Sequence, residues 1–338
     1  TVAVANDEFE TVLYTGNGST QTVPMANITG GVDFVWLKER NGTSYHQLMD
    51  SIRGASKNLW GASTSAERTD NILSAFGASS FDVSDLSNIG GNRSGFTYVA
   101  WCASLPSHTP SNTAGTITSE TKANSFMSAV SYTPVSGLTN TIGHGLGKAP
   151  ELVVYFRRTS ALDHYVYDFI NGPSKYMSLN LTGTAVTNLD VFNNTAPTDT
   201  VLHVGNSSLN GNTQTYIAYC FTSVAGKCKV GSYTGTGASN SIACGFEAEF
   251  VLIKRTESAD NWVIIDNQRG DFDLYPDLSL AEISGDIIDF APTGFTLKGA
   301  GKNASGGTYI YLAIAKDVDK ITPKYDLTYP TQTAPTRI

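Results

Sequence analysis

The residues best placed to do chemistry form an Asp-x-x-Arg-Gly motif, in which a carboxylate precedes a guanidinium group by three positions. Its first copy is Asp50, Arg53 and Gly54. A carboxylate and a guanidinium at this spacing can pair through charge-assisted hydrogen bonds. The glycine can take the positive φ that a tight turn requires and that other residues resist. The motif is therefore compatible with a charged functional site, or with a turn whose aspartate accepts backbone N–H bonds.

The motif recurs twice along the chain, and its second copy is incomplete. The residues predicted to form the three turns are Asp50, Arg53, Gly54, Asp168, Gly172, Asp266, Arg269 and Gly270. In the second copy, Asn171 takes the place of the arginine. A shared active site would hardly tolerate this change in one copy, whereas a structural turn would. We therefore predict that the motif is a structural turn.

The acidic residues give little support for catalysis. Glycoside hydrolysis needs two carboxylates at a fixed separation. No pair recurs among the acidic residues near the repeated strands, which are Asp33, Glu39, Glu151, Glu249 and Asp266. No G-x-S-x-G elbow is present to support a nucleophilic serine. We predict that the protein is not an enzyme, and we keep a carbohydrate-active enzyme as an alternative.

The histidines and the glycine-rich segments are expected in turns and on the surface. The five histidines are His46, His108, His144, His164 and His203. They show no zinc-binding spacing. The segment GHGLG at 143–147 lacks the GK[ST] ending and the following helix of a phosphate-binding loop, so we predict a hairpin turn. No cofactor is predicted. Loops rich in Asp, Asn and Gly leave Ca²⁺ as an open alternative, although no regular D-x-D-x-D spacing is present.

Aromatic side chains offer one route to ligand binding, because exposed rings beside Asn, Asp and Gly suit the stacking of sugars. The chain has 4 tryptophans and 16 tyrosines, which is more than small sandwich cores usually need. Trp36 and Trp262 lie in apolar strands, so we expect them in the core. Trp60 lies in a less regular segment, and we predict it as the residue that contacts a ligand.

The four cysteines do not form a disulfide framework. Cys102 and Cys220 occupy the same position in the segments YVAWC and YIAYC, and the third copy, YLAIA, is aligned with Ala315 there and with Tyr311 as its landmark tyrosine. A position that accepts Cys or Ala is typical of a small buried site. A link between Cys220 and Cys228 stays an open alternative.

Three similar strand pairs must position the turn motifs. Each pair begins with an apolar run, at residues 34–37, 152–155 and 250–253. Such runs suit strands that are buried on both faces. A polar turn and a second half-apolar run follow, so each pair is a predicted β-hairpin.

The landmarks recur in the same order in three copies. Tyr14 to Tyr132 and Asp50 to Asp168 span the same number of residues. A period of about 100 residues is too long for a solenoid repeat and fits one small β-domain per copy. The predicted fold class is all-β, with three tandem β-sandwich repeats of jelly-roll or lectin-like type and an extended C-terminal arm.

The predicted domain boundaries follow these repeats. The three sandwiches are expected at 1–103, 126–225 and 226–318, with a Ser/Thr/Pro-rich linker at 104–125 and the extended arm at 319–338. The linker has few apolar residues, which is typical of a long surface loop. The arm has three prolines and alternating polar residues, which prevent a domain of its own.

Composition excludes some classes of function. The net charge of −8 argues against binding to nucleic acid, because phosphate contacts need clustered Lys and Arg. No apolar window is long enough for a membrane-spanning helix. The start of the chain lacks a basic segment followed by an apolar one, so no signal peptide is predicted. Charged residues are only 15% of the chain, which is typical of an all-β surface protein with polar, uncharged loops.

The first copy resembles a known family. The segments YTGNGSTQTV, VDFVWLKER, HQLMDSIRG and YVAWCA are similar to a repeated β-domain that is common in virion structural proteins of tailed bacteriophages, many of them marine or aquatic. These proteins are often labelled tail or tail-fibre proteins. The second and third copies keep the outline and lose parts of the Asp-Ser-x-Arg-Gly end that is usual in this family. The resemblance covers most of the chain apart from the predicted linker and arm, and it brings no catalytic residues.

What the resemblance implies is a virion component that is made in the host cytoplasm and carried on the extracellular particle. We expect a non-enzymatic structural protein, a tail fibre or a tail-associated surface protein, in contact with the host surface or with other virion proteins. A capsid decoration protein is the alternative. The expected partners are other copies of the chain in a homo-oligomer, other virion proteins and a host surface glycan, without nucleic acid or membrane insertion.

Overall fold

A computed structural model describes residues 7–85, 89–135, 139–205 and 208–317. The described residues contain β-strands and no helix, and every pairing between the strands is antiparallel. The all-β fold class predicted from the sequence is confirmed. No helix in this part of the chain is long and apolar enough to span a membrane. The predicted arm at 319–338 lies outside the described residues.

The strands group into three units, which we call unit 1 (β1–β9), unit 2 (β10–β19) and unit 3 (β20–β28). Each unit has a main sheet and one or two smaller sheets. In unit 1 the main sheet runs in the order β1 (Phe9–Thr15), β9 (Thr97–Ala103), β3 (Phe34–Glu39), β4 (Gln47–Asp50), β5 (Lys57–Trp60) and β6 (Arg68–Thr69), and the smaller sheet in the order β2 (Gln21–Pro24), β8 (Ser80–Val83) and β7 (Leu73–Phe76).

Unit 2 has the same core order with additional strands at one edge. Its main sheet runs in the order β10 (Ser107–Asn112), β11 (Ser119–Ala123), β12 (Met127–Tyr132), β19 (Tyr216–Phe221), β14 (Leu152–Arg157), β15 (Tyr165–Asp168), β16 (Lys175–Ser178) and β17 (Val186–Thr187). Its smaller sheet pairs β13 (Asn140–Gly143) with β18 (Val201–Val204).

Unit 3 repeats this order again. Its main sheet runs in the order β20 (Cys228–Thr234), β28 (Thr308–Ala315), β22 (Ala248–Arg255) and β23 (Val263–Asp266). Its smaller sheets are β21 (Asn240–Ala243), β27 (Gly294–Leu297) and β26 (Ile288–Ala291), and the pair β24 (Phe272–Asp273) and β25 (Ile283–Ser284). The strands β1, β12 and β20 each pair with the last strand of their unit, and that last strand pairs with the hairpin that precedes the turn motif.

The segment 104–125 is not a linker. Its strands β10 and β11 form a hairpin, and β11 pairs with β12, so the segment extends the main sheet of unit 2. Lys122 on β11 forms an ion pair with Asp33 of unit 1 at 2.7 Å. Edge strands of this kind are exposed on their outer side, and Ser and Thr are compatible with that position. Few apolar residues therefore indicated a loop where the structure has a hairpin whose outer strand, β10, is exposed.

The strand register corrects the alignment of the third copy. Tyr14 pairs with Tyr98 and Tyr132 with Tyr216, whereas in unit 3 Tyr233 pairs with Tyr309. The counterpart of the first two landmark tyrosines is therefore Tyr309, and Ala313, rather than Ala315, takes the place of the two buried cysteines. The four cysteines are all free, so Cys220 and Cys228 are not linked.

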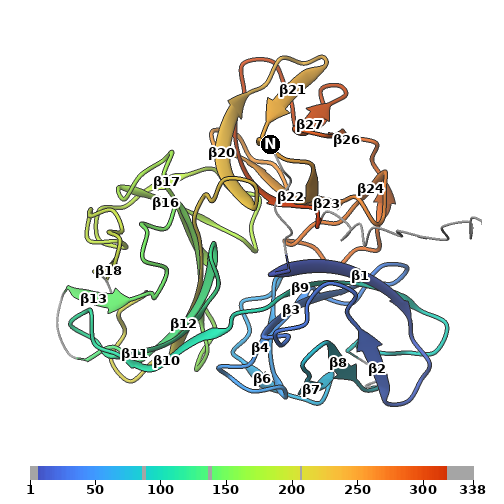
Figure 1. The fold of residues 1–338 in the computed structure, drawn as a ribbon. Coiled ribbons are helices and arrows are strands. Elements are labelled where there is room, and N and C mark those ends of the chain that lie inside the picture. The colour runs from blue at the N-terminus through green and yellow to red at the C-terminus, as the bar shows by residue number, and fades with distance from the viewer. Residues whose placement is uncertain (1–6, 86–88, 136–138, 206–207, 318–338) are drawn as a thin grey trace, which may run out of the picture.

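The main sheets are apolar on both faces because each lies between two cores. One face packs on the smaller sheets of the same unit, forming a separate buried cluster in each unit. The other face joins a central cluster to which all three units contribute. Within it, Phe250 contacts Phe9 and Trp101 at ring distances of 5.7 Å, and Phe34 contacts Tyr219 at 4.9 Å. Figure 1 shows the three units, blue, green and orange, around this common centre.

We predict that Phe250→Ala lowers the free energy of unfolding by about 3–5 kcal/mol, because the substitution leaves a cavity in the central cluster. Urea denaturation followed by tryptophan fluorescence measures the change. The control is Phe272→Ala on β24, where 38% of the side chain is exposed, and the expected loss is less than about 1 kcal/mol. Equal losses in both variants would contradict a central core shared by the units.

Candidate functional site

Each Asp-x-x-Arg-Gly motif forms a tight turn directly after the second strand of its hairpin. In the first turn, the backbone N–H of Arg53 donates to Oδ1 of Asp50 at 2.9 Å, and the N–H of Gly54 donates to the Asp50 carbonyl at 3.1 Å. Gly54, Gly172 and Gly270 have φ values of 97°, 70° and 68°. Only glycine adopts this region without strain, so the glycine allows the chain to reverse while the aspartate holds the turn.

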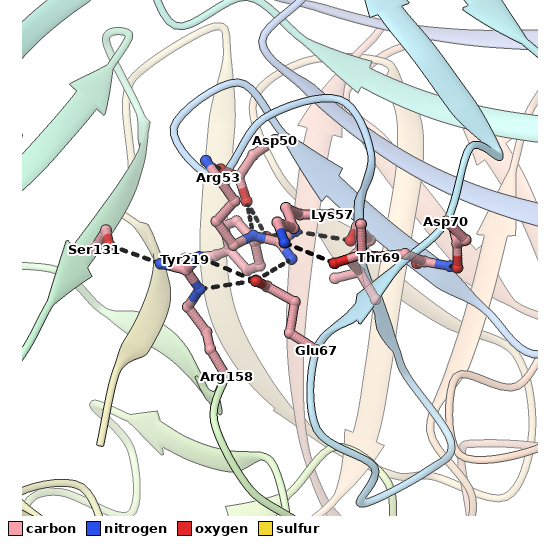
Figure 2. A network of polar contacts seen from close by, with 11 residues as sticks. Asp50, Arg53, Lys57, Glu67, Thr69, Asp70, Ser131, Arg158 and Tyr219 are labelled. Carbon is pink, nitrogen blue, oxygen red and sulfur yellow. Dashed lines mark hydrogen bonds and ion pairs between the residues drawn. The ribbon is translucent and has the colours of Figure 1, made fainter. Parts of the chain in front are cut away.

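The first turn also joins unit 1 to unit 2 (Figure 2). Nη2 of Arg53 donates to the hydroxyl of Tyr219 on β19 at 3.0 Å, and that hydroxyl donates to Oδ2 of Asp50 at 2.7 Å. Glu67 accepts from Nη1 of Arg53 at 3.2 Å and from Nε of Arg158 in unit 2 at 2.8 Å. Two carboxylates of unit 1 and one arginine from each unit thus form one network.

The third turn joins unit 3 to unit 1 in the same way. Nε1 of Trp101 on β9 donates to Oδ2 of Asp266 at 3.0 Å, and the guanidinium of Arg269 lies over the Trp101 ring. Glu282 forms an ion pair with Arg40 of unit 1 at 2.8 Å and lies 3.6 Å from Nη1 of Arg269. Trp101 and Tyr219 occupy the same register position in their sheets.

The second turn lacks these ionic contacts. Asn171 donates to Asp168 within the turn, at 2.9 Å from Nδ2 to Oδ2. Ala185 stands where the other units have a glutamate, and its backbone N–H donates to the carbonyl of Thr256 at 2.8 Å. The N–H groups of Glu67 and Glu282 make the same backbone contact with the next unit. The three units therefore meet in a closed ring. Ion pairs join two of the interfaces, whereas at the third, within the described residues, the buried cation Lys254 of unit 3 donates to the carbonyl of Thr182 in unit 2.

Burial determines the electrostatics of these turns. The side chains of Arg53 and Arg269 are fully buried. Burial alone would lower the pKa of Arg53, but Asp50, Tyr219 and Glu67 outweigh it and raise the pKa above its ordinary value. In the second turn, burial raises the pKa of Asp168, and the hydrogen bonds from Asn171 only oppose the rise. A buried charged pair that is bonded within the protein favours one arrangement of the units, because a displacement would leave a charge without its partner.

Three of the histidines are buried, which corrects the expectation that they lie on the surface or in turns. His46, His144 and His164 are at most 1% exposed. Nδ1 of His46 accepts from Nε1 of Trp36 at 3.1 Å, and Nε2 of His164 lies 2.8 Å from the carbonyl of Trp60 in unit 1. Burial lowers the pKa of His164 to about 4 and that of His46 well below its usual range. Both are neutral near pH 7 and act as hydrogen-bonding parts of the central core.

Trp60, the predicted ligand contact, has its ring covered in part by its own neighbours. Tyr45 stacks on the ring with centroids 4.8 Å apart, and the guanidinium carbon of Arg68 lies 4.5 Å from the ring centroid. Tyr45 is the more exposed partner, at 36%. A sugar that stacked here would therefore meet Tyr45 together with the open part of Trp60.

The acidic residues considered for catalysis have protein partners. Glu39 pairs with Arg93, Glu249 accepts from the backbone N–H of Thr11, and Glu151 accepts from the N–H of Ser223. Among the described residues, no group of three or more His, Cys, Asp or Glu side chains is arranged to hold a metal ion. The predicted turn residues are themselves distributed over three turns and are not brought together in one site.

Comparison with known protein families gives a match that covers the whole ring. A family profile matches residues 5–317, which spans all three units. The chain belongs to this family, described as a domain of unknown function (DUF7483). A search of curated proteins finds no match. Because one profile spans units 1, 2 and 3, the family is defined on the ring rather than on a single unit.

Sequence reasoning found the turns and missed their partners across the interfaces. The missed residues are Arg40, Glu67, Trp101, Arg158, Tyr219 and Glu282. Arg40 and Arg158 could have been found, because both follow their apolar strand at the same spacing. The glutamates carry no such signal, because they lie in loops between short strands. Two further buried carboxyls were also missed: burial raises the pKa of Asp273 to about 6 and that of Asp277 to about 7.

We predict that Arg53→Ala lowers the free energy of unfolding by about 3–5 kcal/mol, because the buried Asp50 carboxylate loses its cation. Asn171→Ala at the matching position of the second turn removes only a neutral donor and is expected to cost about 1 kcal/mol. Chemical denaturation of both variants at pH 7 measures the difference. A loss as small in Arg53→Ala as in Asn171→Ala would contradict the role of the ionic network.

We also predict that His164 makes the protein less stable in mild acid. The unfolded histidine titrates near pH 6.5, whereas the folded one titrates at about 4. As the pH falls from 6.5 toward 4, the unfolded state binds a proton that the folded state does not, so the stability present above pH 6.5 is progressively lost.

The measurement compares the wild type with His164→Gln, which keeps a donor toward the Trp60 carbonyl. The wild type is expected to lose roughly 2–3 kcal/mol more than the variant between pH 7 and pH 4. Buried carboxyls with raised pKa values, such as Glu249 at about 7, act in the opposite direction but equally in both proteins. Parallel stability curves for the two proteins would contradict this role of His164.

Proposed function

We propose that this chain is a non-enzymatic structural protein of a bacteriophage virion, a tail fibre or tail-associated surface protein that contacts the host surface or other virion proteins. One observation carries the proposal. The side chains most able to do chemistry, the carboxylates and guanidinium groups of the first and third turns, are buried between the units and bonded to one another. Their chemistry is used to hold the ring in one arrangement.

The exterior of the ring supports a role in contacts with other molecules. Large apolar side chains that are at least a third exposed occur in all three units: Tyr45, Val135, Phe169, Ile170, Leu181, Val186, Leu189, Phe272, Leu280 and Ile283. Single exposed apolar residues are normal on a protein surface, but five of these lie in the short segment 169–189 of unit 2. The proposed partners are other copies of the chain, other virion proteins and a host surface glycan.

The resemblance of the first copy to virion proteins of tailed bacteriophages is what supports a location on the virion. In this proposal, the chain is made in the host cytoplasm and is carried on the released particle. A ring whose units share a buried central cluster suits a particle that must survive outside the cell. A capsid decoration protein would need the same stability, so the position on the particle is what the experiment must decide.

We predict that gold-labelled antibodies raised against the purified chain bind to the tails of particles from the phage that encodes it. Electron microscopy gives the position, and antibodies against the major capsid protein of the same particles are the control. Antibody label on the head would indicate a capsid decoration protein instead. Particles without label, or without the chain in their mass spectrum, would refute a virion protein.

Host contact is tested separately with the purified chain. An array of bacterial surface glycans is probed with the wild type and with Tyr45→Ala, which removes the exposed ring that stacks on Trp60. Binding that the substitution weakens at least tenfold is expected if this aromatic pair contacts sugar. Release of reducing sugar from any bound glycan would instead favour the alternative of a carbohydrate-active enzyme.

A further inference from the structure

Four positions differ together at one of the three interfaces. Each interface joins a turn side of one unit to a strand side of the next. The turn side consists of the residue at the arginine position of the turn and a residue of the following loop. The strand side consists of the residue after the first hairpin strand and a residue of the last strand. From unit 1 to unit 2 these are Arg53, Glu67, Arg158 and Tyr219; from unit 3 to unit 1 they are Arg269, Glu282, Arg40 and Trp101; from unit 2 to unit 3 they are Asn171, Ala185, Thr256 and Leu312.

The equivalence of these positions follows from backbone contacts, not from the side chains. The N–H groups of Arg40, Arg158 and Thr256 donate to the carbonyls of Thr97, Thr215 and Thr308, which precede or begin the last strand of each unit. Trp101, Tyr219 and Leu312 pair with Trp36, Val154 and Leu252 at matching places in the hairpin strand. The side chains at the third interface have therefore changed while the backbone geometry is kept.

We call an interface mixed when an ionic side of one unit meets a side without the matching charges. A mixed interface would lower the stability of the ring. If the ionic turn side of unit 1 met the strand side of unit 3, Glu67 would face Thr256 and lose the second arginine, and Arg53 would face Leu312 instead of a hydroxyl. If the turn side of unit 2 met an ionic strand side, the arginine there would face Ala185 without a carboxylate. A buried charge without its partner is strongly unfavourable. The cost is absent from a fully matched ionic interface, and from the interface of units 2 and 3, where the buried cation Lys254 donates to the Thr182 carbonyl.

We propose that these matched sets form a pairing code that fixes the cyclic order of the units. Units 1 and 3 have ionic turn sides, and units 1 and 2 have ionic strand sides. In the observed order, 1 to 2 to 3 and back to 1, every interface is matched. In the reverse order, unit 1 would meet unit 3 and unit 2 would meet unit 1, and both of those interfaces would be mixed.

The code acts through specificity and not through added stability. A buried ion pair often contributes no more than well-packed apolar residues would, so the ionic interfaces need not be stronger than the one between units 2 and 3. Three units with the same fold and the same backbone contacts could otherwise pair in either order, or with units of another chain. Mixed charges disfavour these alternatives, as unpaired charges do in other specific interfaces.

The first experiment is a double-variant cycle at the interface between units 1 and 2. The turn-side variant is Arg53→Asn with Glu67→Ala, the strand-side variant is Arg158→Thr with Tyr219→Leu, and the matched variant carries all four substitutions, which copy the third interface. We expect the matched variant to melt higher than the sum of the two half-variant shifts predicts, by roughly 5 °C or more.

Additive shifts would overturn the code, as would a matched variant that melts lower than both halves. A half variant that fails to fold while the matched variant folds supports it. The milder cycle of Glu67→Ala with Arg158→Thr applies the same criterion if the larger substitutions unfold the protein, because Arg158 is partly exposed and Arg53 stays in place.

The second experiment tests the order itself. A mismatched chain carries four substitutions that move an ionic strand side from unit 1 to unit 3: Arg40→Thr, Trp101→Leu, Thr256→Arg and Leu312→Tyr. In the observed order, the substituted chain has two mixed interfaces. The matched variant above has the same number of substitutions and no mixed interface. We expect the mismatched chain to melt at least about 10 °C below the matched one, or to fail to fold. In the reverse order, the mismatched chain would have only matched interfaces. Equal melting temperatures of the two chains, with the units of the mismatched chain still in the observed order, would therefore overturn the proposal, whereas a reversed order would support it.

Discussion

The structure depends on one constraint: each main sheet has two apolar faces, and a single unit can cover only one of them. The smaller sheets cover the first face, and the second face is buried only where three main sheets meet in the central cluster. Burial of apolar surface is the dominant favourable term in folding, so an isolated unit would expose the face that carries Phe34, Leu152 or Phe250. Association into a ring follows from the pattern of the strands.

The ring positions polar groups where water cannot reach them, and this determines what they do. Asp50, Arg53 and Tyr219 satisfy one another across an interface, and His164 bonds to a carbonyl of the neighbouring unit. Buried groups of this kind hold a unique geometry because any displacement leaves a charge or a donor unpaired. The same residues in an open cleft would be candidates for catalysis. Their burial between units is what directs the proposal toward a structural role.

Unit 2 differs from the other units both inside and outside the ring. Its turn has lost the arginine, and its turn side is matched to a strand side of unit 3 that has lost both the arginine and the aromatic ring. It also carries the added hairpin β10–β11 and the exposed apolar residues Phe169 and Ile170. A family profile that spans the complete ring agrees with units that have diverged into different positions and are no longer interchangeable.

The sequence alone determined the all-β class, the hairpins and the turns, because strand alternation, apolar runs and the glycine after Asp-x-x-Arg are local signals. The sequence did not decide between two alignments of the last strand of unit 3 that fit the local pattern equally well. Tyr309 and Tyr311 are two residues apart, and a shift of two keeps every side chain on the same face, so only the pairing with Tyr233 decided the register. Only the tertiary structure revealed that Glu67 meets Arg158 and that His46 and His164 are buried, because those contacts join residues that no local pattern relates.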